Sequence, residues 1–219
     1  EMMKGNHLKG HECLLVGREE NVFGNTHTMQ KSNQPMWNGE RGATVMMRME
    51  GGLGDQIYAI RFAKDIADYG NRVIIDGSEY LADLLIDVEG VSALCQHEAA
   101  MGVYHDYWVP SMSIQIPLKL EFHDLSGESY IRRIGKSEGK IGVNWTGNPM
   151  FEHQQHRLFD QNLMFDMLEN YDCISLQKDD VKIPFWMEQQ PLDTWRQTHK
   201  QISRCDLVIS SCKIGRAHV

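Results

Sequence analysis

The chain has 219 residues, of which 42% are hydrophobic and 24% are charged, and its formal net charge is −8. This composition is typical of a globular protein with one large domain or two small ones, at about 100–200 residues per domain. The negative charge argues against nucleic acid or an anionic membrane surface as the main partner. No stretch approaches the ~20 consecutive apolar residues that a membrane span needs.

The cysteine pattern favours a cytoplasmic protein. Five cysteines are present, and they are widely spaced without a CxxC pair. This favours reduced thiols over a zinc ribbon or a disulfide framework. No signal-peptide pattern is present either, so we expect a cytoplasmic localisation.

Both ends of the sequence indicate a piece of a longer protein. The first residue is Glu1 rather than methionine. The last six residues, from Ile214 to Val219, can be back-translated into a common sequencing-library adapter. We therefore interpret residues 213–219 as an adapter-derived artefact and expect native sequence to stop near Cys212.

The first forty residues show no strand pattern. An apolar run over residues 43–49 then predicts a buried strand that stops at a glycine-rich turn, Gly51 to Asp55. Helical spacing follows as far as Asp68, and Gly70 with Asn71 is typical of a helix end. A short helix is predicted over residues 80–86, and further strands over residues 72–76, 90–94 and 104–109. This alternation predicts βαβ units and a parallel sheet.

A charged stretch over residues 126–139 contains glycines and lacks apolar periodicity, so we place a domain junction there. A second α/β unit follows. Its helices are predicted over residues 161–169 and 192–204, and its strands over residues 140–145, 173–176 and 206–210. The predicted fold class is α/β, with two units joined by a linker.

The glycine-rich turn is the first candidate site. Gly51, Gly52 and Gly54 let the backbone turn tightly and approach a ligand beside a helix start. The dinucleotide fingerprint fits only in part, because Ile57 occupies the third glycine position. Asp76 lies at the spacing of the ribose-binding acid, so an NAD-dependent oxidoreductase is one alternative. Asp55 itself is open to two roles, as a helix cap or as a functional carboxylate.

Several motifs, in order along residues 33–211, resemble one family. They are Trp37-Asn38-Gly39-Glu40, Gly52-Leu53-Gly54-Asp55-Gln56-Ile57, Arg72-Val73-Ile74-Ile75, Ile141-Gly142-Val143-Asn144-Trp145-Thr146-Gly147-Asn148-Pro149, Ser175-Leu176-Gln177-Lys178 and Cys205-Asp206-Leu207-Val208-Ile209-Ser210. The sequence resembles the glycosyltransferase module that follows tetratricopeptide repeats in bacterial proteins. That module is similar to the ADP-heptose heptosyltransferases. The resemblance implies two Rossmann-like domains of the GT-B type, the second of them truncated.

On this resemblance the chain divides into four parts. Residues 1–42 are expected to be a remnant of a helical repeat with a linker, and residues 43–135 the N-terminal acceptor domain. Residues 136–212 are expected to be part of the C-terminal donor domain, followed by the artefact at 213–219. Upstream repeats would offer a surface for a protein partner. Missing strands would expose the second unit, so the 219-residue chain is expected to be poorly soluble and inactive.

The resemblance implies inverting transfer of a hexose or heptose from a nucleotide-diphosphate-sugar to a hydroxyl of a glycan, lipid-linked or protein acceptor. Asp55 matches the position of the general base, which removes the hydroxyl proton during attack. If Asp55 only caps the helix, the alternative is a non-catalytic nucleotide- or sugar-binding module. The resemblance implies no cofactor and no bound metal. His153 and His156 have the spacing of a metal pair but no third ligand.

The donor's diphosphate needs positive charge and N–H donors. The candidates for donor binding are Thr146, Gly147, Asn148, Arg157, Gln177 and Lys178. The first three follow the opening strand of the second unit, where ligands bind in such sheets. Arg157 lacks the basic neighbours of the family, which leaves a solvated loop as its alternative. Gln177 and Lys178 are open between donor contact and a polar strand end.

Overall fold

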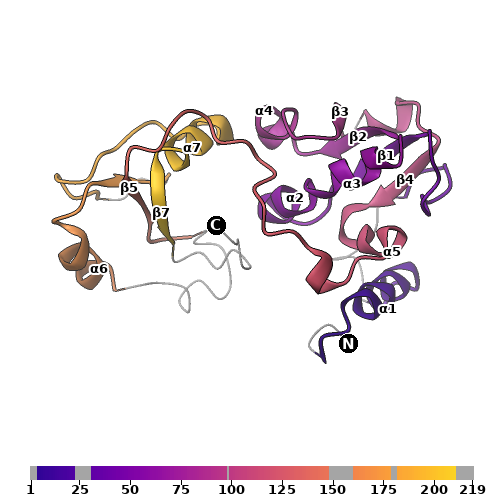
Figure 1. Ribbon diagram of the computed structural model, residues 1–219, viewed down its shortest axis with the longest axis horizontal. Helices are drawn as coiled ribbons and strands as arrows, with labels where there is room; N and C mark the ends of the chain where they lie inside the picture. The colour runs from indigo at the N-terminus through magenta and orange to yellow at the C-terminus, as the bar shows by residue number, and fades with distance from the viewer. Residues whose placement is uncertain (1–3, 23–30, 98, 148–159, 179–181, 211–219) are drawn as a thin grey trace. The chain divides into compact units, whose positions relative to one another are not determined.

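The structure is a computed structural model that describes residues 4–22, 31–97, 99–147, 160–178 and 182–210. The chain forms two compact units, Glu1–Ile131 and Arg132–Val219. Each unit contains one parallel sheet with helices packed around it (Figure 1). The fold is therefore mixed α/β with parallel sheets, as the alternation of strand and helix patterns predicted.

The first unit contains a four-stranded sheet in the order β3-β2-β1-β4. Its strands are β1 (Thr44–Arg48), β2 (Arg72–Gly77), β3 (Val91–Gln96) and β4 (Tyr107–Pro110). The two central strands, β1 and β2, are buried along almost their whole length. Burial on both faces explains why they read as continuous apolar runs rather than as alternating patterns.

The strand predicted over residues 104–109 begins only at Tyr107. The reason is local side-chain bonding. The carboxylate of Asp106 accepts the N–H of Thr44 at 2.8 Å and the hydroxyl of Tyr104 at 2.5 Å. At this end of β1 the Thr44 N–H therefore bonds to the Asp106 side chain instead of to a backbone carbonyl of β4.

The helices of the first unit are α1 (His7–Glu19), α2 (Leu53–Ala59), α3 (Phe62–Asp68), α4 (Ala82–Leu85) and α5 (Gln115–Leu118). Short 3₁₀ turns are η3 (Glu79–Leu81), η4 (Ala100–Gly102), η5 (Ser111–Ser113) and η6 (Phe122–Asp124). The single helix predicted from the glycine-rich turn to Asp68 is wrong, because α2 and α3 are separate. The N–H of Ala63 bonds to the carbonyl of Ile60 at 3.0 Å, and this tighter i→i+3 turn interrupts the α-helical ladder.

Gly90 joins α4 to β3 at a point where only glycine fits. Its φ is +92°, and a Cβ there would lie 2.5 Å from the backbone of Ala63 and Lys64.

We expect Gly90→Ala to lower the unfolding free energy by about 2–4 kcal/mol, from left-handed strain plus overpacking. Urea denaturation measures this. Gly70→Ala is the matched control, since Gly70 has φ +79° and only one atom, 4.0 Å away, near its Cβ position; an equal loss in both variants would contradict the steric argument.

The second unit contains a three-stranded parallel sheet in the order β6-β5-β7. Its strands are β5 (Lys140–Asn144), β6 (Cys173–Ser175) and β7 (Cys205–Ser210), and its helices are α6 (Gln161–Leu168) and α7 (Trp195–Ile202). The α7 helix begins later than the predicted Leu192. Thr194 caps it by accepting the N–H of Gln197 at 3.1 Å, which defines its first turn.

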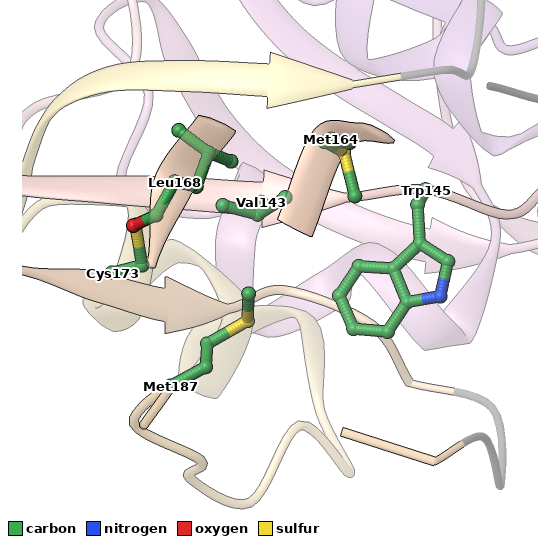
Figure 2. Packing of buried hydrophobic residues seen from close by; sticks show 6 residues of the cluster. All are labelled: Val143, Trp145, Met164, Leu168, Cys173 and Met187. Atoms are coloured by element: carbon green, nitrogen blue, oxygen red, sulfur yellow. The ribbon is translucent and has the colours of Figure 1, made fainter. Parts of the chain in front are cut away.

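A buried cluster forms the core of the second unit (Figure 2). It consists of Val143, Trp145, Met164, Leu168, Cys173 and Met187. Side chains from α6 pack here onto the central strand β5 and the edge strand β6. The core thus fixes the carboxyl end of β5, from which the predicted donor-binding turn leaves.

Ion pairs gather at the amino ends of the strands of the second unit. Glu188 accepts bonds from Arg204 at 2.7 Å and contacts Lys140 at 3.0 Å. Lys140 also contacts Asp172 at 2.7 Å. The bond from Arg204, the largest cause, and that from Lys140 lower the pKa of Glu188 from 4.5 to about 2. The network lies at the edge of the sheet opposite the predicted donor turn, so we assign it to stability.

The lowered pKa of Glu188 fixes the sign of an acid-stability prediction. Its stabilising effect is present above the unfolded pKa near 4.5 and is lost as the pH falls towards about 2. We expect Glu188→Gln to lower the unfolding free energy at pH 7 by about 1–3 kcal/mol and to flatten its pH dependence between pH 5 and 2. Denaturant titrations at several pH values measure both. The control is the exposed Glu169→Gln, and an unchanged pH slope in Glu188→Gln would contradict the assignment.

Candidate functional site

The glycine-rich turn connects β1 to α2 at the carboxyl edge of the first sheet. Gly51 has φ +72°, and a Cβ there would lie 2.5 Å from Oδ2 of Asp55 and 2.8 Å from Cε of Met112. Glycine is thus required at this position by both backbone conformation and space. Gly54 lies in α2 with open space around its Cβ position, so the turn does not need it.

Asp55 is exposed, and its carboxylate folds back over the turn. Oδ2 accepts the N–H of Gly52 at 2.8 Å, while the N–H of Asp55 bonds to the Gly52 carbonyl at 3.1 Å. The capping role is therefore present in the structure. No residue in the described part of the chain bonds to Oδ1, which leaves this oxygen free to accept a proton from a hydroxyl within hydrogen-bond reach.

Asp76 does not face a ligand. It is fully buried in β2, and its Oδ2 accepts the Nε–H of Arg48 at 2.7 Å. Its Oδ1 lies 2.7 Å from Nδ1 of His97 without hydrogen-bond alignment. The carboxylate is thus enclosed by protein and paired with Arg48, and Asp76 is not placed to bind a ribose.

Neither Arg48 nor His97 was predicted from the sequence to lie at a site. A signal was present, because Arg48 is a cation inside an apolar run. It pairs with Asp76 in the parallel register of β1 and β2. His97 follows directly after β3, so three neighbouring strands contribute to this buried group. Because the three side chains come from separate strands, their grouping could not be recognised from neighbouring positions in the sequence.

The turn after β5 is held by Gln177. The side chain of Gln177 is buried, and its Oε1 accepts the backbone N–H groups of Trp145 at 3.2 Å and Thr146 at 3.1 Å. Its Nε2 donates to Oγ1 of Thr146 at 2.7 Å. Two of the predicted donor-binding residues, Thr146 and Gln177, are thus brought together. The Gln177 side chain fixes the backbone of the turn through these bonds.

The remaining donor candidates are placed less completely. Gly147 follows Thr146 and is half-buried, while Lys178 is exposed next to Gln177. Asn148 and Arg157 lie outside the described residues, and so do His153 and His156. The structure therefore groups Thr146, Gly147, Gln177 and Lys178 at the carboxyl edge of the second sheet, and the assignment of this edge to a donor stays a prediction.

Trp145 adds an N–H group at the same edge that the sequence analysis missed. Its ring is buried, yet its Nε1 has no hydrogen-bond partner among the described residues. In Figure 2 this nitrogen points away from Val143 and Met187. Buried N–H groups are normally satisfied by protein, water or a ligand. The indole therefore offers a donor at the end of β5.

Other features of the described residues suggest no competing site. A shallow depression of about 500 Å³ lies at the amino ends of β1 and β4, opposite the glycine-rich turn, and is lined by polar residues such as Arg41 and Asp106. No group of three His, Cys, Asp or Glu side chains in the described ranges could hold a metal ion. Within those ranges no helix combines the length and apolar character required to cross a bilayer.

Comparison with known proteins gives one structural match. No protein-family model and no curated protein matches the sequence. In structure the chain is similar to TibC, a bacterial iron-containing dodecameric glycosyltransferase from enterotoxigenic E. coli H10407, with a TM-score of 0.50 and 12% identity. The match covers 78% of this chain and 54% of TibC, so the chain spans about half the length of that enzyme. At this identity the match shows a shared fold.

Proposed function

We propose that the chain is part of a glycosyltransferase of the GT-B type that moves a sugar from a nucleotide-diphosphate-sugar to an acceptor hydroxyl. The fold it shares with a bacterial glycosyltransferase supports the class. The observation that carries the mechanism is Asp55, whose exposed carboxylate follows the carboxyl end of β1. One of its oxygens accepts the Gly52 N–H, and the other has no partner in the part of the chain that the structure describes. Ligands of parallel α/β sheets bind at this edge.

In the proposed reaction the acceptor oxygen attacks the anomeric carbon on the face opposite the diphosphate. Asp55 takes the hydroxyl proton while the new carbon–oxygen bond forms. The bond to the diphosphate breaks, and its electron pair stays on the leaving phosphate oxygen. A single displacement of this kind inverts the anomeric configuration. A base held within hydrogen-bond reach typically accelerates such a step ~10²–10⁴-fold.

We assign donor binding to the carboxyl edge of the second sheet. Lys178 is exposed there and supplies a positive charge for the diphosphate. The Gln177 side chain holds the backbone at Thr146. The indole N–H of Trp145, which has no partner among the described residues, is a further donor. Asn148 and Arg157 complete the proposed set. Developing charge on the leaving group is stabilised by such preorganised donors.

The finer identity follows the sequence resemblance. We propose transfer of a hexose or heptose, in the manner of the ADP-heptose heptosyltransferases, to a glycan, lipid-linked or protein acceptor in the cytoplasm. Upstream tetratricopeptide repeats would supply a surface for a protein partner.

A second candidate is a nucleotide- or sugar-binding module without catalysis. The bond between Asp55 and the Gly52 N–H favours this candidate. Capping of α2 alone would account for an aspartate at this position. The two candidates share a donor-binding edge and differ in whether bound donor is consumed.

The test separates the two by measuring donor consumption. The 219-residue chain and a longer gene product that contains it are incubated with nucleotide-diphosphate sugars, and released nucleoside diphosphate is measured with and without acceptors. The longer product is expected to release nucleoside diphosphate in an acceptor-dependent manner, whereas the 219-residue chain is expected to be inactive. Saturable donor binding without release would identify the binding module, and neither binding nor release would contradict both candidates.

A further inference from the structure

The N-terminal helix α1 packs against the segment that follows β4, beside the glycine-rich turn. Near its start, the ring of His7 stacks on Phe122 with centroids 4.9 Å apart. One turn later, Nδ1 of His11 lies 2.9 Å from the carbonyl oxygen of Met112. Figure 1 shows α1 next to α5, which follows Met112. The helix is therefore packed against the segment of the first unit that follows β4.

The last turn of α1 is anchored by a buried ion pair. The side chain of Arg18 is 4% exposed, and both of its terminal nitrogens donate to the carboxylate of Glu50, which is 13% exposed. Glu50 is the residue directly before Gly51. The pair thus joins α1 to the residue that directly precedes the glycine-rich turn.

Glu50 also binds the segment after β4. Its Oε2 accepts the N–H of Met112 at 3.1 Å, and its own N–H donates to Oγ of Ser111 at 3.0 Å. Cε of Met112 and Oδ2 of Asp55 both lie against Gly51, at 2.8 and 2.5 Å from where a Cβ would be. A series of contacts therefore runs from Arg18 through Glu50 to Met112, whose Cε lies beside Gly51, as Oδ2 of Asp55 does.

We propose that α1 holds the glycine-rich turn in place and that Arg18 is a positioning residue for Asp55. This inference rests on the proposed function, in which Asp55 is the base. Removing the guanidinium would leave Glu50 as a nearly buried unpaired charge, and such a carboxylate moves towards water rather than stay unpaired. Because Glu50 is adjacent to Gly51 and accepts the N–H of Met112, its movement displaces the start of the turn in which the Gly52 N–H holds the Asp55 carboxylate.

The structural half of the inference is tested by amide hydrogen exchange in the 219-residue chain. We expect Arg18→Gln to speed exchange of the Gly52 and Met112 amides about tenfold or more, while the β1 amides keep their protection. The matched control is Lys9→Gln, which removes one positive charge from the same helix at an exposed pair with Glu12. Unchanged exchange at Gly52 and Met112 in Arg18→Gln would overturn the inference.

A double variant guards against misfolding. Arg18→Gln combined with Glu50→Gln leaves no lone buried charge and still removes the ion pair. If the single variant loses protection in β1 as well, the double variant decides the outcome. It is expected to keep the β1 protection and to show faster exchange at Gly52, and wild-type exchange at Gly52 would overturn the inference.

The functional half uses the longer gene product in the transfer assay. We expect Arg18→Gln to lower kcat about 10–10²-fold with the donor KM within about twofold, since a displaced base slows the chemical step rather than donor binding. Arg18→Lys is expected to restore kcat in part. Wild-type kcat in Arg18→Gln, alongside a strong loss in Asp55→Asn, would overturn the positioning role. Wild-type kcat in Asp55→Asn would instead overturn the proposed base, whatever the exchange data show.

Discussion

Replacing Asp55 with asparagine is expected to lower kcat for sugar transfer ~10²–10⁴-fold, with little effect on stability. The amide oxygen of asparagine accepts the Gly52 N–H as the carboxylate does at 2.8 Å, so the cap of α2 is retained. The amide cannot take a proton from the acceptor hydroxyl. Steady-state kinetics on the longer gene product, together with urea denaturation, measure the two effects separately.

Asp55→Ala is the companion variant, because it removes the cap as well as the base. It is expected to show the same loss of kcat and in addition to lower the unfolding free energy by about 0.5–2 kcal/mol. If Asp55→Asn transfers sugar at the wild-type rate while only Asp55→Ala is impaired, the carboxylate is a cap alone. The binding module would then be the better account of the chain.

Asp76→Ala is expected to lower the unfolding free energy of the first unit by about 3–5 kcal/mol. The change leaves Arg48, whose side chain is 6% exposed, without the carboxylate to which its Nε donates at 2.7 Å. A guanidinium that has lost its buried carboxylate opposes burial of the central strands β1 and β2. Urea denaturation gives the free energy, and hydrogen exchange of the β1 and β2 amides assigns the transition to this unit.

Two further variants control for the loss of a carboxylate. Asp68→Ala removes an exposed partner of Lys64 on α3 and is expected to have little measurable effect. Arg48→Met combined with Asp76→Leu removes both buried charges and is expected to cost less than Asp76→Ala alone. A similar small effect of Asp76→Ala and Asp68→Ala would show that Arg48 does not depend on its partner.

The strands were predictable because their signals are local. The apolar runs in β1 and β2 are continuous in sequence, and burial on both faces of a parallel sheet requires that continuity. The errors arose where bonds between particular groups override a pattern. The i→i+3 bond from the Ala63 N–H to the Ile60 carbonyl divides one helical pattern into the two helices α2 and α3. The Asp106 carboxylate accepts the Thr44 N–H, so β4 begins after this residue, at Tyr107.

The candidate site was predictable where it lies on one turn and less so where it depends on contacts across the fold. Asp55 and Gly51 are neighbours in sequence, so their turn could be identified directly. Gln177 was identified only as a possible donor contact, because its bonds to Thr146 span 31 residues. The buried pair of Arg48 and Asp76 and the anchoring of Glu50 by Arg18 likewise require the folded chain.

The anomeric configuration of the first product tests the central claim most directly. The longer gene product is supplied with an α-linked nucleotide-diphosphate-sugar and an acceptor, and the new glycosidic bond is examined by proton NMR early in the reaction. Direct attack by a hydroxyl that Asp55 deprotonates predicts a β-linked product. An α-linked product, or no acceptor-dependent transfer from any donor, would contradict the account.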